Sequence, residues 1–327
     1  MVQRQGVFII SLDFELGWGV HDINADKHYD ENILAVHKVV PEMLKLFQRY
    51  DIHATWATVG ALFAKSVEEL KTYIPAEKPS YERPAYAPYH LIEQGNIQAQ
   101  DARYFAPHLI EQVKQVPHQE MATHTFSHYY CLERGQTSEQ FKEDIKAAVD
   151  IGKIAYTSIV FPRNQTNPQY LKVCQSLGIR AYRGNTRHPL YAPHCHQDGW
   201  KWRRILLIVD TYVNLTGHHT FSLSTIEKDP IYNIPASAFL RPYHRKMHLL
   251  ERLRIRRIKR AMTYAAKHHE AYHLWWHPHN LGKHIARNFD ALEEILAHYA
   301  ALNKRYGFQS RSMQDVVDSI ENQKGED

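Results

Sequence analysis

Short apolar runs alternate with amphipathic stretches along most of the chain. Most of the runs are four to eight residues long and rich in β-branched residues, which is typical of buried strands. The stretches between them carry apolar residues at helical spacing, as at Phe141, Ile145, Ala148 and Val149. Strands are predicted at 7–12, 52–59, 119–123, 157–161, 179–182, 203–213 and 272–276, and helices at 32–50, 138–152, 168–177 and 288–305. Strands that alternate with helices in this way indicate an α/β fold with a parallel sheet.

The same pattern gives the expected domain organisation. We expect one domain over residues 1–317, with no internal repeat. Residues 65–118 are polar and carry six prolines, so they are interpreted as an insertion with short helices. A basic helical stretch is expected near 241–265, and residues 318–327 are expected to form a polar tail.

Composition narrows the function classes only slightly. The chain has 327 residues, 44% of them hydrophobic, and a net charge of +5, which is too small to indicate nucleic-acid binding. Three cysteines are too few for a disulfide framework, and sparse cysteine is typical of a reducing compartment. The first apolar run is too short for a signal peptide. We therefore expect a cytoplasmic protein, peripheral to the membrane if it meets one.

Histidine is abundant, with 23 residues, and one histidine pair follows a predicted strand. In H-T-F-S-H, the side chains of His124 and His128 are four residues apart, so both can reach one metal ion. The spacing alone decides little, because 244/248, 269/273 and 273/277 show it too. The position of His124 and His128 at the end of a strand is what favours a site.

A second predicted strand ends in two carboxylates. In S-L-D-F-E, Asp13 and Glu15 stand at positions i and i+2, so both side chains point the same way from a strand. One carboxylate can complete a metal-binding set with the two histidines. The other can serve as a general base. The alternative is a solvated loop start with no chemistry.

Together these motifs resemble the polysaccharide deacetylase family, the NodB-like group also called carbohydrate esterase family 4. H-T-F-S-H is similar to the second motif of that family, and A-T-W-A-T-V-G at 54–60 to the strand after its first helix. F-P-R-N-Q at 161–165 resembles the third motif, L-W-W-H-P at 274–278 the fifth, and residues 291–310 the closing helix and strand. The resemblance implies a distorted (β/α)7 barrel with one divalent metal, zinc first, with Co, Ni, Fe and Mn open.

The resemblance also implies roles for individual residues. Asp13 is expected to be the base and His277 the general acid, with His279 as its rival. Arg163 is expected to hold Asp13 in its charged form. The metal ligands implied are Glu15, His124 and His128, and the residues expected to contact substrate are Asn164, Trp18 and His279.

The chain departs from the family pattern in two places. The adjacent Asp-Asp of the first motif is replaced by Asp13-Phe14-Glu15, so the roles of Asp13 and Glu15 could be exchanged. The fourth motif is not identified. Its candidates are Asp198, Trp200 and Asp210.

The function implied is removal of N-acetyl groups from an amino sugar, in a polysaccharide or a glycan-biosynthesis intermediate. Two alternatives remain open. One is hydrolysis of another C–N bond, in a cyclic imide or ureide, and the other is a non-catalytic binding protein on the same barrel.

One further feature lies outside these motifs. Residues 241–260 contain nine Lys or Arg and one Glu. The plain interpretation is a solvated basic helix that packs an apolar stripe on the core. The functional interpretation is peripheral contact with an anionic membrane surface or a phosphorylated substrate. No nucleic-acid partner is expected, because no nucleic-acid-binding fold is evident.

Overall fold

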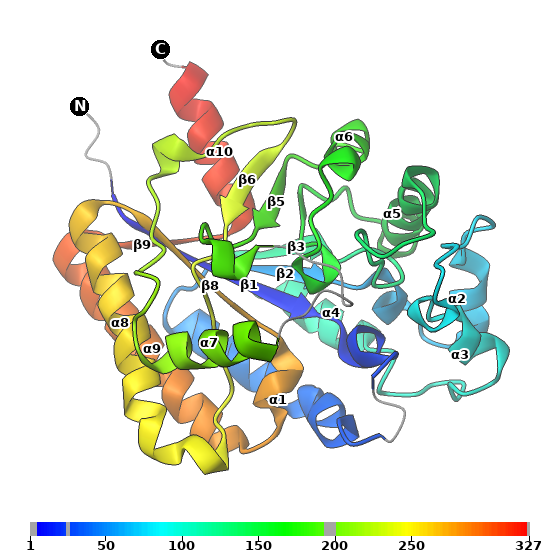
Figure 1. Ribbon diagram of the computed structural model, residues 1–327, viewed down its shortest axis with the longest axis horizontal. Helices are drawn as coiled ribbons and strands as arrows, with labels where there is room; N and C mark the ends of the chain where they lie inside the picture. Colours follow the sequence, from blue (N-terminus) through cyan, green and yellow to red (C-terminus); the bar gives the residue numbers. More distant parts are fainter. Residues whose placement is uncertain (1–4, 24–26, 193–200, 326–327) are drawn as a thin grey trace.

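A computed structural model describes residues 5–23, 27–192 and 201–325. Its centre is a parallel sheet in the order β6-β5-β4-β3-β2-β1-β8-β7, which curls into a distorted barrel as predicted (Figure 1). A short strand, β9 (Gln309–Arg311), pairs with the start of β1. The other strands are β1 (Val7–Phe14), β2 (Ala54–Thr58), β3 (Gln119–Thr123), β4 (Ser158–Ile159), β5 (Ala181–Gly184), β6 (Tyr232–Pro235), β7 (Ala238–Phe239) and β8 (Ala271–Trp276).

One segment joins the two edges of this sheet. Strands β6 and β7 are separated by only two residues, Ala236 and Ser237. Strand β6 pairs with β5, and the amide of Ala236 donates to the carbonyl of Gly184. Strand β7 pairs with β8, and the amide of Ser237 donates to the carbonyl of His273. Together β6 and β7 therefore take one strand position, which closes the sheet into a barrel of seven positions.

Helices surround the sheet and bury its outer face. Every residue of β1 is buried, so this strand lies at the centre of the core. Long helices pack apolar stripes around it, and Val36, Met262 and Leu292 belong to the main hydrophobic cluster. These helices are α1 (Asp30–Arg49), α5 (Ser138–Gly152), α8 (Glu251–His268) and α9 (Ile285–Tyr306). The shorter α6 (Pro168–Ser176) packs in a separate cluster.

Residues 65–118 contain several short helices. They are α2 (Val67–Tyr73), the 3-10 turn η3 (Pro84–Tyr86), α3 (Tyr89–Glu93) and α4 (Pro107–Gln115). Side chains such as Leu109 and Ile110 of α4 join the main core. The insertion is therefore packed against the barrel and contributes to its stability.

The strand predicted at 203–213 is wrong. This stretch belongs to helix α7 (Lys201–Tyr212), which lies across the front of the barrel in Figure 1. A short apolar run cannot distinguish a strand from a helix by its period alone. The polar tail predicted at 318–327 is also helical as far as Gly325, because it continues α10 (Met313–Gly325), whose Val317 and Ile320 are buried.

All the polar motifs lie just after strands of this sheet. Because the strands are parallel, their carboxyl ends meet at one end of the barrel. In barrels of parallel strands this end carries the active site.

Candidate active site

Two histidines and one carboxylate converge at the carboxyl ends of β1 and β3. Glu15 Oε2 lies 3.1 Å from His124 Nε2 and 3.0 Å from His128 Nε2. All three residues are buried, and one ligand atom from each lies within 4.8 Å of the others. These are the three residues that the sequence predicts as metal ligands, and their arrangement could hold a metal ion.

The hydrogen bond of His124 leaves its Nε2 as the atom that can bind a cation. His124 Nδ1 lies 2.7 Å from the carbonyl oxygen of Val160, which can only accept, so Nδ1 donates and Nε2 of the neutral ring presents a lone pair. That lone pair faces a carboxylate oxygen of Glu15. Two acceptors so close repel each other unless a proton or a cation lies between them. Two histidines and a carboxylate are a donor set that suits zinc and several other transition metals.

The loop that carries the histidines is anchored by Asp144 of helix α5. Its Oδ1 accepts from the amide of Phe126 at 2.7 Å, and its Oδ2 accepts from the hydroxyl of Ser127 at 2.5 Å. Thr125 and His128 both have positive φ, at 65° and 60°, which strains residues other than glycine. The hydrogen bonds to Asp144 hold the loop in that conformation. Nothing in the local sequence identifies this anchor.

Gly19 leaves room for the carboxylate of Glu15. A Cβ atom at this position would lie 2.1 Å from both Cδ and Oε1 of Glu15. Gly19 is therefore required if the Glu15 side chain is to point toward His124 and His128. The sequence shows Gly19 near the first motif but gives no reason for it.

Asp13 lies beside this cluster and is held by Arg183. The guanidinium donates from Nη1 to Oδ1 at 2.6 Å and from Nη2 to Oδ2 at 2.8 Å. Burial raises the pKa of Asp13, but the charge and hydrogen bonds of Arg183, together with the charges of His124 and His277, hold the pKa below its ordinary value. The carboxylate is thus kept ready to accept a proton.

The expected contact of Arg163 with Asp13 is wrong. Arg163 donates from Nη2 to both carboxylate oxygens of Asp22, at 2.6 and 2.8 Å, and lies over the ring of Tyr130. Arg163 lies in the 3-10 turn η4 (Pro162–Asn164), where its φ is 55°. Arg183, on β5 itself, points inward and takes the place predicted for Arg163. Within the motif at 161–165, it is Asn164 that joins the network, because its Oδ1 accepts from Arg183 at 2.9 Å.

His277 follows β8 and faces both carboxylates. Its Nε2 lies 3.4 Å from Glu15 Oε1 and 3.7 Å from Asp13 Oδ2. On the other side of the ring, Nδ1 lies 3.2 Å from Nδ2 of Asn280. Tyr29 donates its hydroxyl proton to Oδ1 of Asn280, which directs the amide nitrogen toward His277. A neutral His277 therefore carries its proton on Nε2, the atom that faces the site.

These groups line a cavity of about 370 Å³ at the end of the barrel. Its wall includes Asp13, Glu15, His277, His279 and Asn164, so most of the predicted residues are brought together. His279 is 3% exposed, and burial lowers its pKa to about 3, which keeps the ring neutral.

The predicted substrate contact of Trp18 is wrong. The side chain is 1% exposed, packs on the ring of Tyr104 and donates from Nε1 to the carbonyl of Tyr104 at 2.8 Å. Trp18 lies in the 3-10 turn η1 (Leu16–Val20), which directs it into the core.

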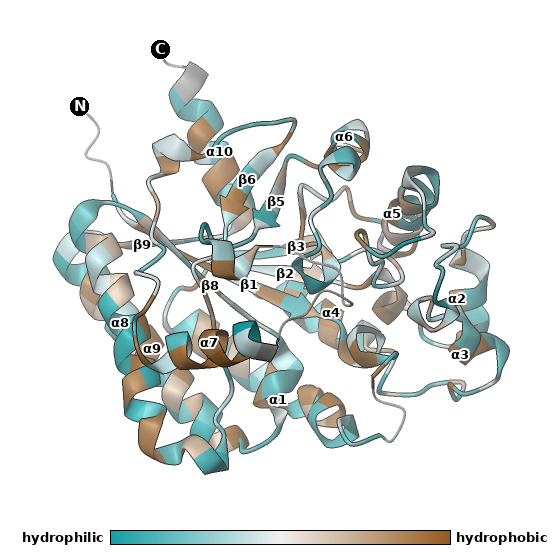
Figure 2. Ribbon diagram, viewed as in Figure 1, coloured by the Kyte–Doolittle hydropathy of each residue, from teal (hydrophilic) through white to brown (hydrophobic). Residues whose placement is uncertain are grey.

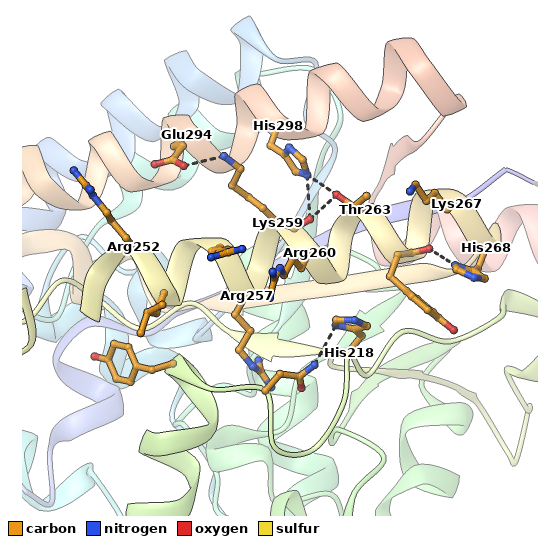
Figure 3. A pocket seen from close by; sticks show the side chains of 15 residues that line it. His218, Arg252, Arg257, Lys259, Arg260, Thr263, Lys267, His268, Glu294 and His298 are labelled. Carbon is orange, nitrogen blue, oxygen red and sulfur yellow. Dashed lines mark hydrogen bonds and ion pairs between the residues drawn. The ribbon is translucent and has the colours of Figure 1, made fainter. Parts of the chain in front are cut away.

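A larger and more open groove lies away from these residues, along the outer surface of α8 (Figure 3). Lys259 and His298 mark its border with α9, and His218 lies on the opposite side of α8. Most of its charged lining is basic: Arg252, Arg256, Arg257, Lys259, Arg260 and Lys267, against Glu294 alone. None of the residues that line it carries the chemistry described above.

Comparison with known families agrees with this geometry. The family model described as polysaccharide deacetylase matches residues 10–182, which include the first motif and the histidine pair. The chain belongs to the polysaccharide deacetylase family. The match ends one residue before Arg183 and well before His277. The roles of these two residues are therefore inferred from their positions in the structure and not from the family match.

Solved structures share the fold at low identity. A Mycobacterium smegmatis protein whose name assigns it to the polysaccharide deacetylases superposes with a TM-score of 0.62 at 12% identity, covering 99% of this chain and 93% of that one. A Pseudomonas aeruginosa PAO1 protein of the same assignment gives 0.54 at 11%, covering 95% and 89%. A 4-alpha-glucanotransferase from Thermococcus litoralis gives 0.52 at 11%, covering 97% and 40%. No curated protein matches the chain by sequence.

Proposed function

We propose that this family member is a metal-dependent hydrolase that removes N-acetyl groups from an amino sugar in a polysaccharide or a glycan-biosynthesis intermediate. The observation that carries the proposal is that two neighbouring carboxylates have different partners. Glu15 contacts both histidines, whereas Asp13 contacts a guanidinium instead. One carboxylate is thus placed to bind a cation and the other to accept a proton.

Asp13 and His277 are placed to move the two protons of amide hydrolysis. Asp13 takes a proton from the attacking water, and Arg183 keeps it ionised until then. His277 presents Nε2 to the same point, so that as an imidazolium it gives its Nε2 proton to the departing amine and returns to the neutral ring. Asn280 and Tyr29 are positioning residues, because they act on the substrate only through the ring of His277.

Glu15, His124 and His128 would hold the metal. A divalent ion bound by these residues supplies Lewis acidity, which polarises the acetyl carbonyl and favours loss of a proton from water. Zinc is our first choice, and Co, Ni, Fe or Mn fit the same donors.

Acetate release from a panel of N-acetylated saccharides tests the proposal. We expect release by the metal-loaded protein and a decrease in kcat of at least about 100-fold in Asp13→Asn, since general bases contribute on this scale. Asp150→Asn, an exposed change on α5, is the matched control. Hydrolysis of a cyclic imide or ureide without acetate release would support the other C–N hydrolase. Saccharide binding without any hydrolysis would support the non-catalytic binding protein.

We also propose that the protein contacts an anionic membrane peripherally, because of the outer face of α7. Trp202, Ile205, Leu206 and Val209 follow helical spacing, and each is at least 39% exposed. In Figure 2 much of the α7 ribbon has the brown of hydrophobic residues. Apolar residues beside a basic groove are a combination that suits a surface of anionic lipids. No helix among the described residues is long and apolar enough to cross a bilayer.

Co-sedimentation with vesicles tests this contact. We expect binding to phosphatidylglycerol vesicles at low salt and little binding to phosphatidylcholine. Trp202→Ser together with Leu206→Ser should weaken it severalfold, whereas Leu34→Ser, an exposed leucine of α1, should not. Equal binding to both lipids, or no effect of the α7 changes, would contradict the proposal.

A further inference from the structure

A second cavity of about 260 Å³ opens beside the catalytic one, beneath helix α7. Arg163, Asn164 and Trp275 line both cavities, so the two adjoin. The roof is the inner face of α7, where Arg203, Leu207 and Thr211 repeat at i, i+4 and i+8. One face of α7 therefore forms part of the cavity wall.

This cavity is strongly basic. Five arginines line it, and no Asp or Glu does so among the residues that the structure describes. Three of the five are neutralised by acids outside the lining: Arg163 by Asp22, Arg254 by Glu251 and Arg257 by Asp210.

Arg203 and Arg241 are the remaining two, and neither contacts a carboxylate of the described residues. Arg203 Nε donates to the carbonyl of Leu190 at 2.7 Å, and Arg241 Nε donates to Thr211 Oγ1 at 2.9 Å. Burial and the neighbouring Arg204 lower the pKa of Arg241, as expected for a guanidinium without an anionic partner. Two positive charges in this cavity are therefore uncompensated.

Two further donors point to a missing acceptor. Arg163 Nη1 and Arg257 Nε are buried and have no hydrogen-bond partner among the described residues. Unpaired buried donors are costly, so such groups are usually satisfied by a ligand or by water.

We infer that the arginine-lined cavity binds a phosphate or pyrophosphate group attached to the sugar whose acetamide lies at Asp13. Two uncompensated guanidiniums match a phosphate group, which carries nearly two negative charges, better than a single carboxylate. Guanidinium forks also match the geometry of phosphate oxygens. The inference rests on the proposed function for the nature of the sugar. The phosphate source can be a sugar phosphate, a nucleotide or a lipid.

Binding of inorganic pyrophosphate tests the cavity without requiring catalysis. We would measure it by calorimetry in the wild type and in His128→Ala, which removes a candidate metal ligand that could itself attract the probe. Binding should persist in His128→Ala. In that background, Arg203→Gln and Arg241→Gln should each weaken it about tenfold, the scale of one charge-assisted hydrogen bond. Arg305→Gln, an exposed change on α9, should leave it unchanged.

Acetate release tests the same cavity with substrates. We expect kcat/KM for N-acetylglucosamine 1-phosphate or UDP-N-acetylglucosamine to exceed that for N-acetylglucosamine at least tenfold, and Arg241→Gln to reduce this ratio. Arg241→Lys should recover part of it, which separates lost charge from misfolding. A lipid pyrophosphate-linked N-acetylated sugar is the third phosphorylated substrate to be compared. The substrate with the highest kcat/KM identifies whether the phosphate belongs to a sugar phosphate, a nucleotide or a lipid.

The outcomes are distinguishable from those of the proposed function. If no substrate releases acetate but pyrophosphate binding depends on Arg203 and Arg241, the cavity is confirmed and the deacetylase proposal fails. Pyrophosphate binding that is absent, or that both substitutions leave unchanged, would overturn the cavity inference.

Discussion

Arg183 and Asp13 face each other through two parallel hydrogen bonds, with Nη1–Oδ1 at 2.6 Å and Nη2–Oδ2 at 2.8 Å. Both side chains are buried, and the Arg183 guanidinium also lies 4.2 Å from the ring centre of Trp275. The pair is thus fixed on both sides at the edge of the catalytic cavity. It holds Asp13 ionised and leaves Glu15 free to contact the histidines.

Substitution of Arg183 should move the acidic limb of the activity profile. Burial alone raises the pKa of Asp13, and Arg183 is the largest of the charges that together reverse that effect. In Arg183→Gln the pKa should therefore rise, so the base becomes protonated, and activity is lost, at a higher pH than in the wild type. The measurement is kcat/KM for acetate release against pH, with Arg163→Gln for comparison. A limb that moves only in Arg163→Gln would restore the assignment made from the sequence.

A methyl group at position 19 should displace a candidate metal ligand. The new Cβ in Gly19→Ala would overlap the carboxylate of Glu15 and push it away from His124 and His128. We expect bound metal to fall several-fold while the far-ultraviolet circular dichroism stays that of the wild type. Val20→Ala, the next residue, is the control. Full metal occupancy in Gly19→Ala would show that Glu15 is not a ligand.

Asp144 should make stability depend on pH. Burial, despite three hydrogen bonds, raises its pKa from 3.8 to about 6. Because the folded pKa is raised, the stabilisation of the protonated form is complete below about pH 4 and is lost as pH rises through about 6. Asp144→Asn cannot ionise. The free energy of unfolding of Asp144→Asn, relative to that of the wild type, should therefore increase between pH 4 and pH 7, by on the order of 3 kcal/mol.

Urea unfolding of the metal-free proteins at several pH values measures this difference. Asp150→Asn on the same helix is the matched control, because Asp150 is exposed. A difference between Asp144→Asn and the wild type that stays constant from pH 4 to pH 7 would contradict the raised pKa.

The parts of the site that the sequence predicts share one property. His124, His128, Asp13 and Glu15 stand in short motifs at the ends of strands, so their convergence follows from a parallel sheet. His277 likewise follows an apolar run. These positions could be predicted because strand direction alone determines which end of the barrel they occupy.

The missed parts depend on contacts between distant segments. Arg183 lies inside a short strand with no motif around it, and its partner is 170 residues away. Asp144 accepts hydrogen bonds from the loop that carries the histidines, and Gly19 leaves space for the Glu15 side chain. Neither role produces a pattern in the sequence. The apolar run of α7 was ambiguous because its length suits a strand and a helix equally, and its apolar face stays exposed in the structure.

Metal content per chain tests the central claim most directly. We would measure it by elemental analysis in the wild type, in His128→Ala and in His248→Ala, whose exposed histidine belongs to a pair with the same i, i+4 spacing. The account predicts about one equivalent of divalent metal in the wild type and in His248→Ala, and none in His128→Ala. Equal metal in all three proteins, or none in the wild type after reconstitution, would contradict it.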